Sequence, residues 1–174
     1  MKKVGLATCF FFYFGACLQA YALSKTIENL QNECVIFNYT EVTGYYDDTL
    51  TERFKNSFIY NSVRSMLSKK YKESYKLGKC RRRAFNSFRK QYLPISKEHY
   101  NERSDISDLG FDAVVCGSDQ VWNPTFYDAC NPFYYLTFAK GLPKIAYAPS
   151  IGVSDIPEPY VKQFKEYLSD FKAI

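Results

Sequence analysis

A short apolar run, Ala113 to Cys116, is followed at once by polar side chains. Asp112 and Gly117 bound the run, and this pattern is typical of a buried strand that is covered on both faces of a parallel sheet. In open α/β sheets, ligands bind at the carboxyl ends of the strands. The run therefore predicts an interior strand whose far end is a candidate binding edge.

The polar stretch supplies the first candidate substrate-binding residues, which are Gly117, Ser118, Asp119, Gln120, Trp122 and Asn123. Gly117 lets the backbone approach a ligand closely. Asp119 can accept hydrogen bonds from sugar hydroxyls, and Trp122 offers a flat face for stacking, so we expect both to face an open cleft. A strand followed by a capped turn would show the same pattern without a ligand, and the residues alone leave both interpretations open.

The N-terminal part indicates a strand–helix–strand unit. Val4 to Thr8 and Cys34 to Phe37 are apolar runs, and apolar residues from Ala16 to Leu30 recur on one helical face. This spacing predicts a helix from Gly15 to about Leu30. Gly15 stands next to a strand end, where free amides and the helix dipole favour an anion.

The same N-terminus also fits a secretory signal, with basic residues at the start, an apolar run to Leu18 and small residues before a cleavage position after Ala22. The alternative is then a secreted or anchored, non-enzymatic protein with a signal peptide at residues 1–22. We favour the strand–helix–strand interpretation, because the helical periodicity continues past Ala22, which a cleaved signal would not require.

The remaining segments continue the alternation of helices and strands. We expect helices from Arg53 to Lys72 and from Lys79 to Tyr92, separated by Gly78, and an amphipathic helix from Pro157 to about Phe171. Phe133 to Phe138 reads as a short strand or a turn. The pattern predicts an α/β fold with a Rossmann-like, open, mostly parallel sheet flanked by helices.

A second candidate binding loop follows the apolar strand Lys144 to Pro149 and contains Ser150 and Gly152. The last residues, Lys172 to Ile174, look like the start of another strand without a partner. We therefore expect the chain to be a fragment or the product of a truncated reading frame.

The charge is unevenly distributed. Between Arg53 and Lys90 there are thirteen basic residues and one acidic residue, Glu73, whereas the whole chain carries only +5. A basic patch can face phosphates, nucleic acid or an anionic membrane, although solvated helices show the same pattern. The acidic remainder and the lack of interleaved aromatic residues argue against nucleic acid.

No metal site is predicted. The six cysteines lack the two-residue gap of zinc and redox motifs, and we expect most of them to be buried in a protein of a reducing compartment. His99 is the only histidine, and we expect it to be solvated. Asp105, Asp108 and Asp112 have a ligand-like spacing but fit a solvated helix end better.

Three stretches, Gly117 to Pro124, Leu18 to Leu23 and Ile145 to Gly152, together resemble the polysaccharide pyruvyl transferase family, and Phe85 to Leu93 is similar to the helix before its key strand. The similarity covers nearly the whole chain. It implies one half of a glycosyltransferase-B-like enzyme of two Rossmann-like domains. Residues 1–174 would then be the N-terminal domain, and the C-terminal domain would be absent.

The resemblance also implies an activity. Characterised members transfer a pyruvyl group from phosphoenolpyruvate to a sugar as a ketal, in a surface polysaccharide such as capsule or exopolysaccharide of the cell envelope, or in its lipid-linked precursor. This chain would be the acceptor-side half, inactive alone, with no cofactor beyond the donor substrate. Asp119 is the candidate catalytic residue that orients or deprotonates a hydroxyl.

In the first turn, family members carry polar residues where this chain has Phe10 to Gly15, so Tyr13 and Gly15 are the candidate substrate-binding residues there. The expected partners are a sugar or a lipid-linked oligosaccharide, and peripherally the membrane through the basic helices, with no nucleic acid. The expected location is the cytoplasm, at the inner face of the membrane. A non-catalytic sugar-binding relic of the family remains an open alternative.

Overall fold

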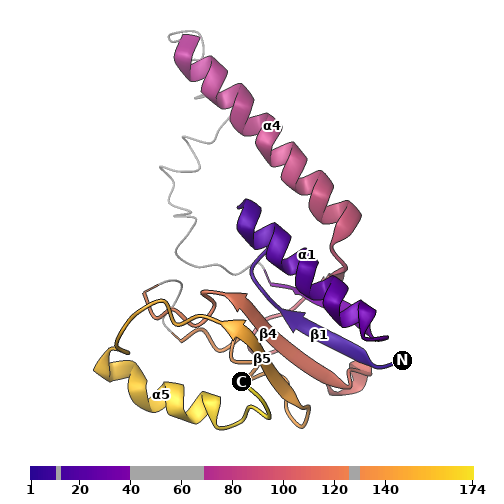
Figure 1. The fold of residues 1–174 in the computed structure, drawn as a ribbon, viewed down its shortest axis with the longest axis vertical. Helices are drawn as coiled ribbons and strands as arrows, with labels where there is room; N and C mark the ends of the chain where they lie inside the picture. Colours follow the sequence, from indigo (N-terminus) through magenta and orange to yellow (C-terminus); the bar gives the residue numbers. More distant parts are fainter. Residues whose placement is uncertain (11–12, 40–68, 126–129) are drawn as a thin grey trace.

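The protein folds around a parallel sheet of five strands in the order β3-β2-β1-β4-β5 (Figure 1). The computed structural model describes residues 1–10, 13–39, 69–125 and 130–174. The strands are β1 (Lys3–Ala7), β2 (Glu33–Asn38), β3 (Ile95–His99), β4 (Ala113–Asp119) and β5 (Lys144–Pro149). The all-parallel, open arrangement confirms the predicted Rossmann-like α/β class.

The apolar runs form the interior of this sheet, as predicted from their composition. β4 lies between β1 and β5, and β1 lies between β2 and β4. Gly5 in β1 is needed for packing, because a Cβ at this position would overlap the ring of Phe37. Phe37 can therefore lie across the middle of the sheet.

One face of the sheet is covered by helix α1 (Phe14–Asn29), as the helical periodicity predicts. Side chains alternate along a strand, so Leu6 of β1 and Ile36 of β2 point to this face, where they pack with Leu23 and Ile27 of α1. Residues 1–22 thus comprise an interior strand and the first half of α1. The signal-peptide alternative would require this part of the fold to be cleaved off.

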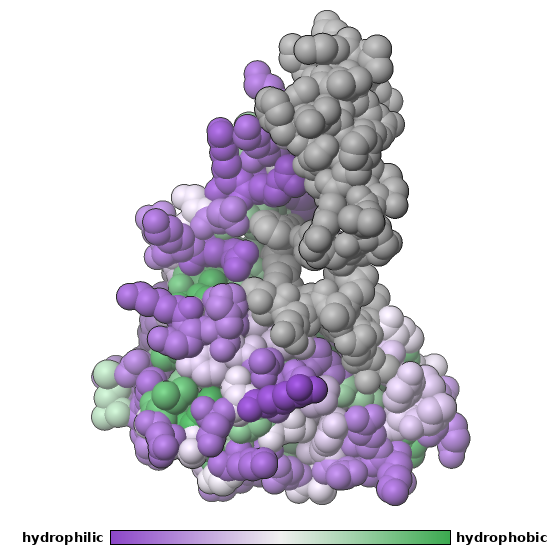
Figure 2. Space-filling model, turned by 180° about the vertical axis from the view of Figure 1, so that it is seen from behind, coloured by the Kyte–Doolittle hydropathy of each residue, from purple (hydrophilic) through white to green (hydrophobic). Residues whose placement is uncertain are grey.

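Helix α4 (Lys69–Tyr92) lies beside α1 and extends beyond it, and the visible part is strongly hydrophilic (Figures 1 and 2). The prediction that Gly78 separates two helices is wrong, because α4 runs through it. A glycine in a helix costs only about 1 kcal/mol relative to alanine, which a long helix can absorb. The expected helix from Arg53 lies outside the described residues up to position 68. Pro94 follows the end of α4, as expected.

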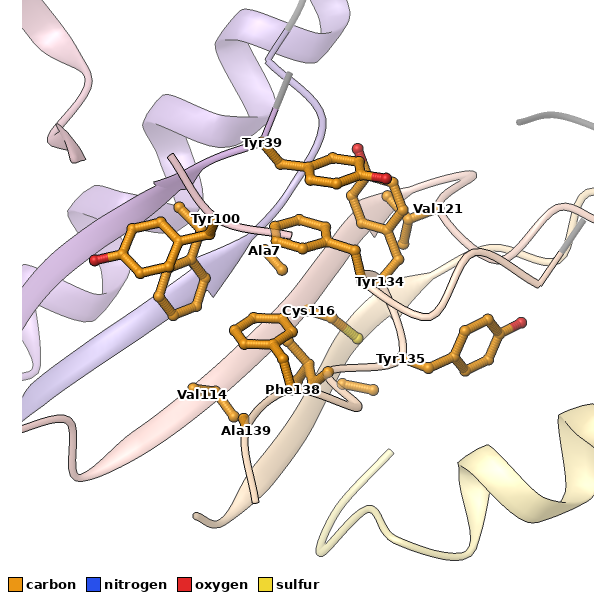
Figure 3. Packing of buried hydrophobic residues seen from close by; sticks show 14 of the residues in the cluster. Ala7, Tyr39, Tyr100, Val114, Cys116, Val121, Tyr134, Tyr135, Phe138 and Ala139 are labelled. Atoms are coloured by element: carbon orange, nitrogen blue, oxygen red, sulfur yellow. The ribbon is translucent and has the colours of Figure 1, made fainter. Parts of the chain in front are cut away.

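The opposite face is covered by a series of turns from Cys130 to Ala139 (Figure 3). Phe133 stacks on Tyr39 with ring centroids 3.9 Å apart and on Phe138 at 5.2 Å. Asn131 Nδ2 donates a hydrogen bond of 2.9 Å to the Tyr39 hydroxyl. Of the two readings of Phe133 to Phe138, the turn is the correct one.

Helix α5 (Glu158–Leu168) packs on the same face as these turns, and Phe164 is its buried residue. The chain then returns to the free edge of β5, where Ala173 forms an isolated parallel bridge with Ile145. The backbone bond from Ala146 N to Ala173 O measures 2.9 Å. The last residues, where we expect the start of a further strand, therefore pair with β5 at a single position.

Candidate functional site

The loops that follow β4 and β5 lie side by side at the carboxyl edge of the sheet. Ser150 N donates a 2.8 Å hydrogen bond to Asp119 O, and Trp122 N donates one of 3.3 Å to Ser150 O. The structure therefore brings together the two loops that the sequence singles out separately. Their exposed polar side chains include Asp119, Gln120 and Ser150.

Asp119 is held in an unusual conformation at the end of β4. Its φ is 78°, in the left-handed region, and its Oδ1 accepts a 2.8 Å hydrogen bond from Gln120 N. Ala148, at the end of β5, also has a positive φ of 47°. Residues with such a strained backbone persist only where the surrounding structure holds them, and they are often found at functional sites. The Asp119 carboxylate is thus exposed and fixed in direction.

Two glycines are required by close contacts between these loops. A Cβ at Gly117, where φ is 106°, would overlap the carbonyl oxygen of Tyr147 in β5. A Cβ at Gly152, where φ is 69°, would meet the side-chain amides of Gln120 and Asn123. The lack of a side chain at Gly117 therefore allows β5 to approach closely. From the sequence we expect it to allow a ligand to approach.

Asn123 is a structural residue of the β4 loop. It is only 4% exposed, its Nδ2 donates to Gln120 Oε1 at 2.8 Å, and its Oδ1 accepts from Thr125 N at 2.9 Å. These bonds leave Gln120 as the exposed member of the pair. A direct binding role therefore fits Gln120 better than Asn123.

The expectation that Trp122 faces an open cleft is wrong, because the ring is buried at 4% exposure. It stacks on Tyr135 with centroids 5.4 Å apart and planes at 5°, and Phe171 meets it edge-on at 5.5 Å. Its Nε1 donates to Tyr134 O at 3.1 Å. The ring packs within the core and its N–H group has a hydrogen-bond acceptor there. Trp122 therefore anchors the loop after β4 to the core.

Gln19 is a residue of this edge that sequence reasoning missed. Its Nε2 donates to Thr8 Oγ1 at 2.9 Å and also to Cys9 O, and its Oε1 accepts from Ser118 Oγ at 2.9 Å. One amide from α1 thus joins the end of β1 to the end of β4. The only signal in the sequence is its place within the stretch Leu18 to Leu23.

Tyr13 and Gly15 lie at the start of α1, and both are exposed. Tyr13 is the N-cap residue, and a Cβ at Gly15 would have nothing within 4 Å. Their binding role stays a prediction.

Comparison with known proteins decides the family. Residues 14–174 match the family model described as polysaccharide pyruvyl transferase. The chain belongs to the polysaccharide pyruvyl transferase family. The match includes Gln19, Asp119 and Gly152, while β1 precedes it. No curated protein and no solved structure matches the chain.

Other polar residues of the chain lie apart from this edge or are engaged locally. Asp105 accepts hydrogen bonds from Ser107 N and Oγ, which lower the pKa of its carboxyl. Asp112 accepts a 2.7 Å bond from Lys3 N, and His99 is exposed at the end of β3. Within the described ranges, no three His, Cys, Asp or Glu residues form a group that could hold a metal ion.

Five of the six cysteines are buried, and none of the six forms a disulfide bond. Burial raises the pKa of the Cys34 thiol to about 12 and also raises that of Cys116. These thiols behave as small apolar side chains, as expected from their positions in apolar strands. Within the described part of the chain, no helix is long and apolar enough to span a membrane.

Proposed function

We propose that this chain is the acceptor-side half of a pyruvyl transferase that forms a pyruvyl ketal on a sugar of a surface polysaccharide or its lipid-linked precursor. Membership of the family supports the reaction class. The observation that carries the acceptor role is the exposed Asp119 carboxylate, fixed at the end of an interior strand beside Ser150. Carboxylates and hydroxyls are the partners that sugar hydroxyls need.

The proposed reaction uses phosphoenolpyruvate and two hydroxyls of one sugar. Both sugar oxygens form bonds to C2 of the enolpyruvyl group, and the bond from C2 to the phosphate oxygen breaks. One hydroxyl proton is transferred to the methylene carbon, which becomes the methyl group of the ketal. The other proton leaves with the phosphate as hydrogen phosphate. Asp119 would orient the attacking hydroxyl or accept its proton, as a general base does.

The donor phosphate requires cationic groups, which these loops do not supply. Neither residues 118–125 nor residues 149–156 include a lysine or an arginine. Phosphate and carboxylate groups are bound most strongly by charge-assisted hydrogen bonds from such side chains. We therefore propose that a second domain binds phosphoenolpyruvate and that the edge around Asp119 binds only the sugar.

Sugar binding by the chain tests the acceptor role. Saturation-transfer NMR with methyl glycosides of galactose, glucose and mannose should detect binding to the wild type. Asp119→Asn should weaken it about tenfold or more, since a hydrogen bond to a charged group is lost. Asparagine also tolerates a left-handed backbone, so the loop should keep its shape. Asp108→Asn, an exposed change before β4, should leave binding unchanged.

Equal binding by the two variants would refute the role of Asp119. The half-enzyme part of the proposal has a separate test, in which the chain is incubated with phosphoenolpyruvate and a lipid-linked sugar. No phosphate release is expected. Turnover by the chain alone would contradict the half-enzyme assignment and leave the sugar site intact. The proposed location is the cytoplasm, and six cysteines without a disulfide bond are compatible with it.

A further inference from the structure

Helix α4 has two unlike sides, and one of them is occupied by contacts with α1. Phe85 lies 4.9 Å from Phe14, and Tyr21 lies 6.0 Å from Phe88 and 6.1 Å from Tyr92, all measured between ring centroids. These contacts place the aromatic side of α4 against α1. The other side of the helix faces away from this contact.

A line of basic residues follows that other side. Lys76, Lys79, Arg83 and Lys90 are all exposed. Their spacing of three, four and seven positions keeps them within about 60° of the helix circumference and spreads them over about 21 Å. We call these four residues the basic stripe.

The basic stripe has no internal counter-charge within the part of the chain that the structure describes. None of its members forms an ion pair there, and Glu73 is the only acidic residue of α4. Like charges three and four positions apart destabilise a helix. An external anion would remove this repulsion.

Exposed apolar side chains lie where α4 meets α1, away from the basic stripe. Phe14, Leu18 and Leu77 are 68%, 57% and 70% exposed. Arg81 lies 5.5 Å from the Phe14 ring centroid, and Leu77 lies one turn before Arg81. The basic stripe itself includes no apolar side chain, so its attraction to an anionic surface is electrostatic.

We propose that the basic stripe of α4 docks the protein on an anionic phospholipid bilayer. A straight row of charges matches a planar surface, and each lysine or arginine near such a surface adds to the attraction. Nucleic acid fits less well, because the rings of Phe85, Phe88 and Tyr92, which could otherwise stack on bases, are engaged with α1. This proposal does not depend on the reaction proposed above.

Vesicle sedimentation tests the docking surface. The full chain should bind vesicles of phosphatidylcholine with about 30% phosphatidylserine, and it should bind pure phosphatidylcholine vesicles at least tenfold less. The triple variant K76E/K79E/R83E should lose more than about 100-fold in partitioning, because each basic residue removed costs roughly fivefold and the added glutamates are repelled as well. Raising the salt concentration to about 1 M should release the wild type.

A matched variant separates the basic stripe from net charge. K140E/K162E/K165E changes three other exposed lysines by the same total charge and should retain most of the binding. Circular dichroism should report folded protein for both variants, and the milder K76Q/K79Q/R83Q should give an intermediate loss. Equal losses from the two glutamate triples, equal binding to neutral vesicles, or tighter binding to an RNA strand of mixed sequence would overturn the proposal.

Discussion

The amide of Gln19 connects three elements at the carboxyl edge of the sheet. It contacts the ends of β1 and β4 while belonging to α1. Ser118, next to the proposed catalytic Asp119, has its hydroxyl directed by this amide at 2.9 Å. Gln19 is therefore a positioning residue for this edge of the sheet. It stabilises the edge by forming hydrogen bonds with partly buried polar groups of Thr8, Cys9 and Ser118.

Gln19→Ala should lower the free energy of unfolding by about 2 kcal/mol or more, because several hydrogen bonds are lost and their partners are left unsatisfied. Urea denaturation followed by circular dichroism measures the change. Gln91→Ala, an exposed position on α4, should change stability by less than about 0.5 kcal/mol. Similar losses from the two variants would mean that the Gln19 contacts contribute little.

At the scale of helices and strands, the apolar runs and helical spacings were sufficient to predict β1, α1, β2, β4, β5 and α5. Two local features could not be predicted in the same way. Glycine at position 78 predicts a helix end, but α4 continues through it. The free-energy cost of one glycine is smaller than the stabilisation that the rest of the helix provides. Trp122 looked exposed among polar neighbours, but its partner Tyr135 belongs to a later loop that only the fold brings close.

The continuity of α4 leads to a prediction about Gly78. Its position is exposed, and a Cβ would have nothing within 4 Å. Gly78→Ala should therefore stabilise the helix by about 0.5–1 kcal/mol, since alanine loses less backbone freedom. Amide hydrogen exchange in the α4 segment should slow correspondingly. Unchanged or faster exchange there would show that the helix is interrupted at this residue.

For the molecule as a whole, burial separates the cysteines into two groups. Cys80 is exposed, and Cys9, Cys17, Cys34, Cys116 and Cys130 are buried. Burial raises the pKa of Cys130 to about 11, as it raises that of Cys34 to about 12. A raised pKa means a smaller thiolate fraction, roughly one in ten thousand for Cys34 at pH 8, and the thiolate is the reactive form.

Ellman's reagent at pH 8 should therefore label one thiol quickly in the native protein and all six after unfolding in guanidinium. Cys80→Ser should remove the fast reaction and leave stability unchanged. Raising the pH should speed up labelling of the buried thiols only if the fold opens, because the reagent must reach the sulfur as well as find it deprotonated. Rapid labelling of several thiols in the Cys80→Ser variant would contradict the buried arrangement.

The N-terminus decides whether the whole sheet can form. β1 pairs in parallel with β2 through Val4 and Cys34 and with β4 through Ala7 and Cys116, so it is the strand that joins the two halves of the sheet.

Deleting residues 1–22 would remove this strand together with Thr8, Gln19 and half of α1. The β2 and β4 backbone groups that β1 satisfies would be left unpaired in an apolar setting, at several kcal/mol in total. The shortened chain should therefore show no cooperative thermal transition, and calorimetry of both forms measures this directly. A cooperative transition in the shortened chain would support the signal-peptide alternative. It would also require a different sheet from the one in which β4 presents Asp119.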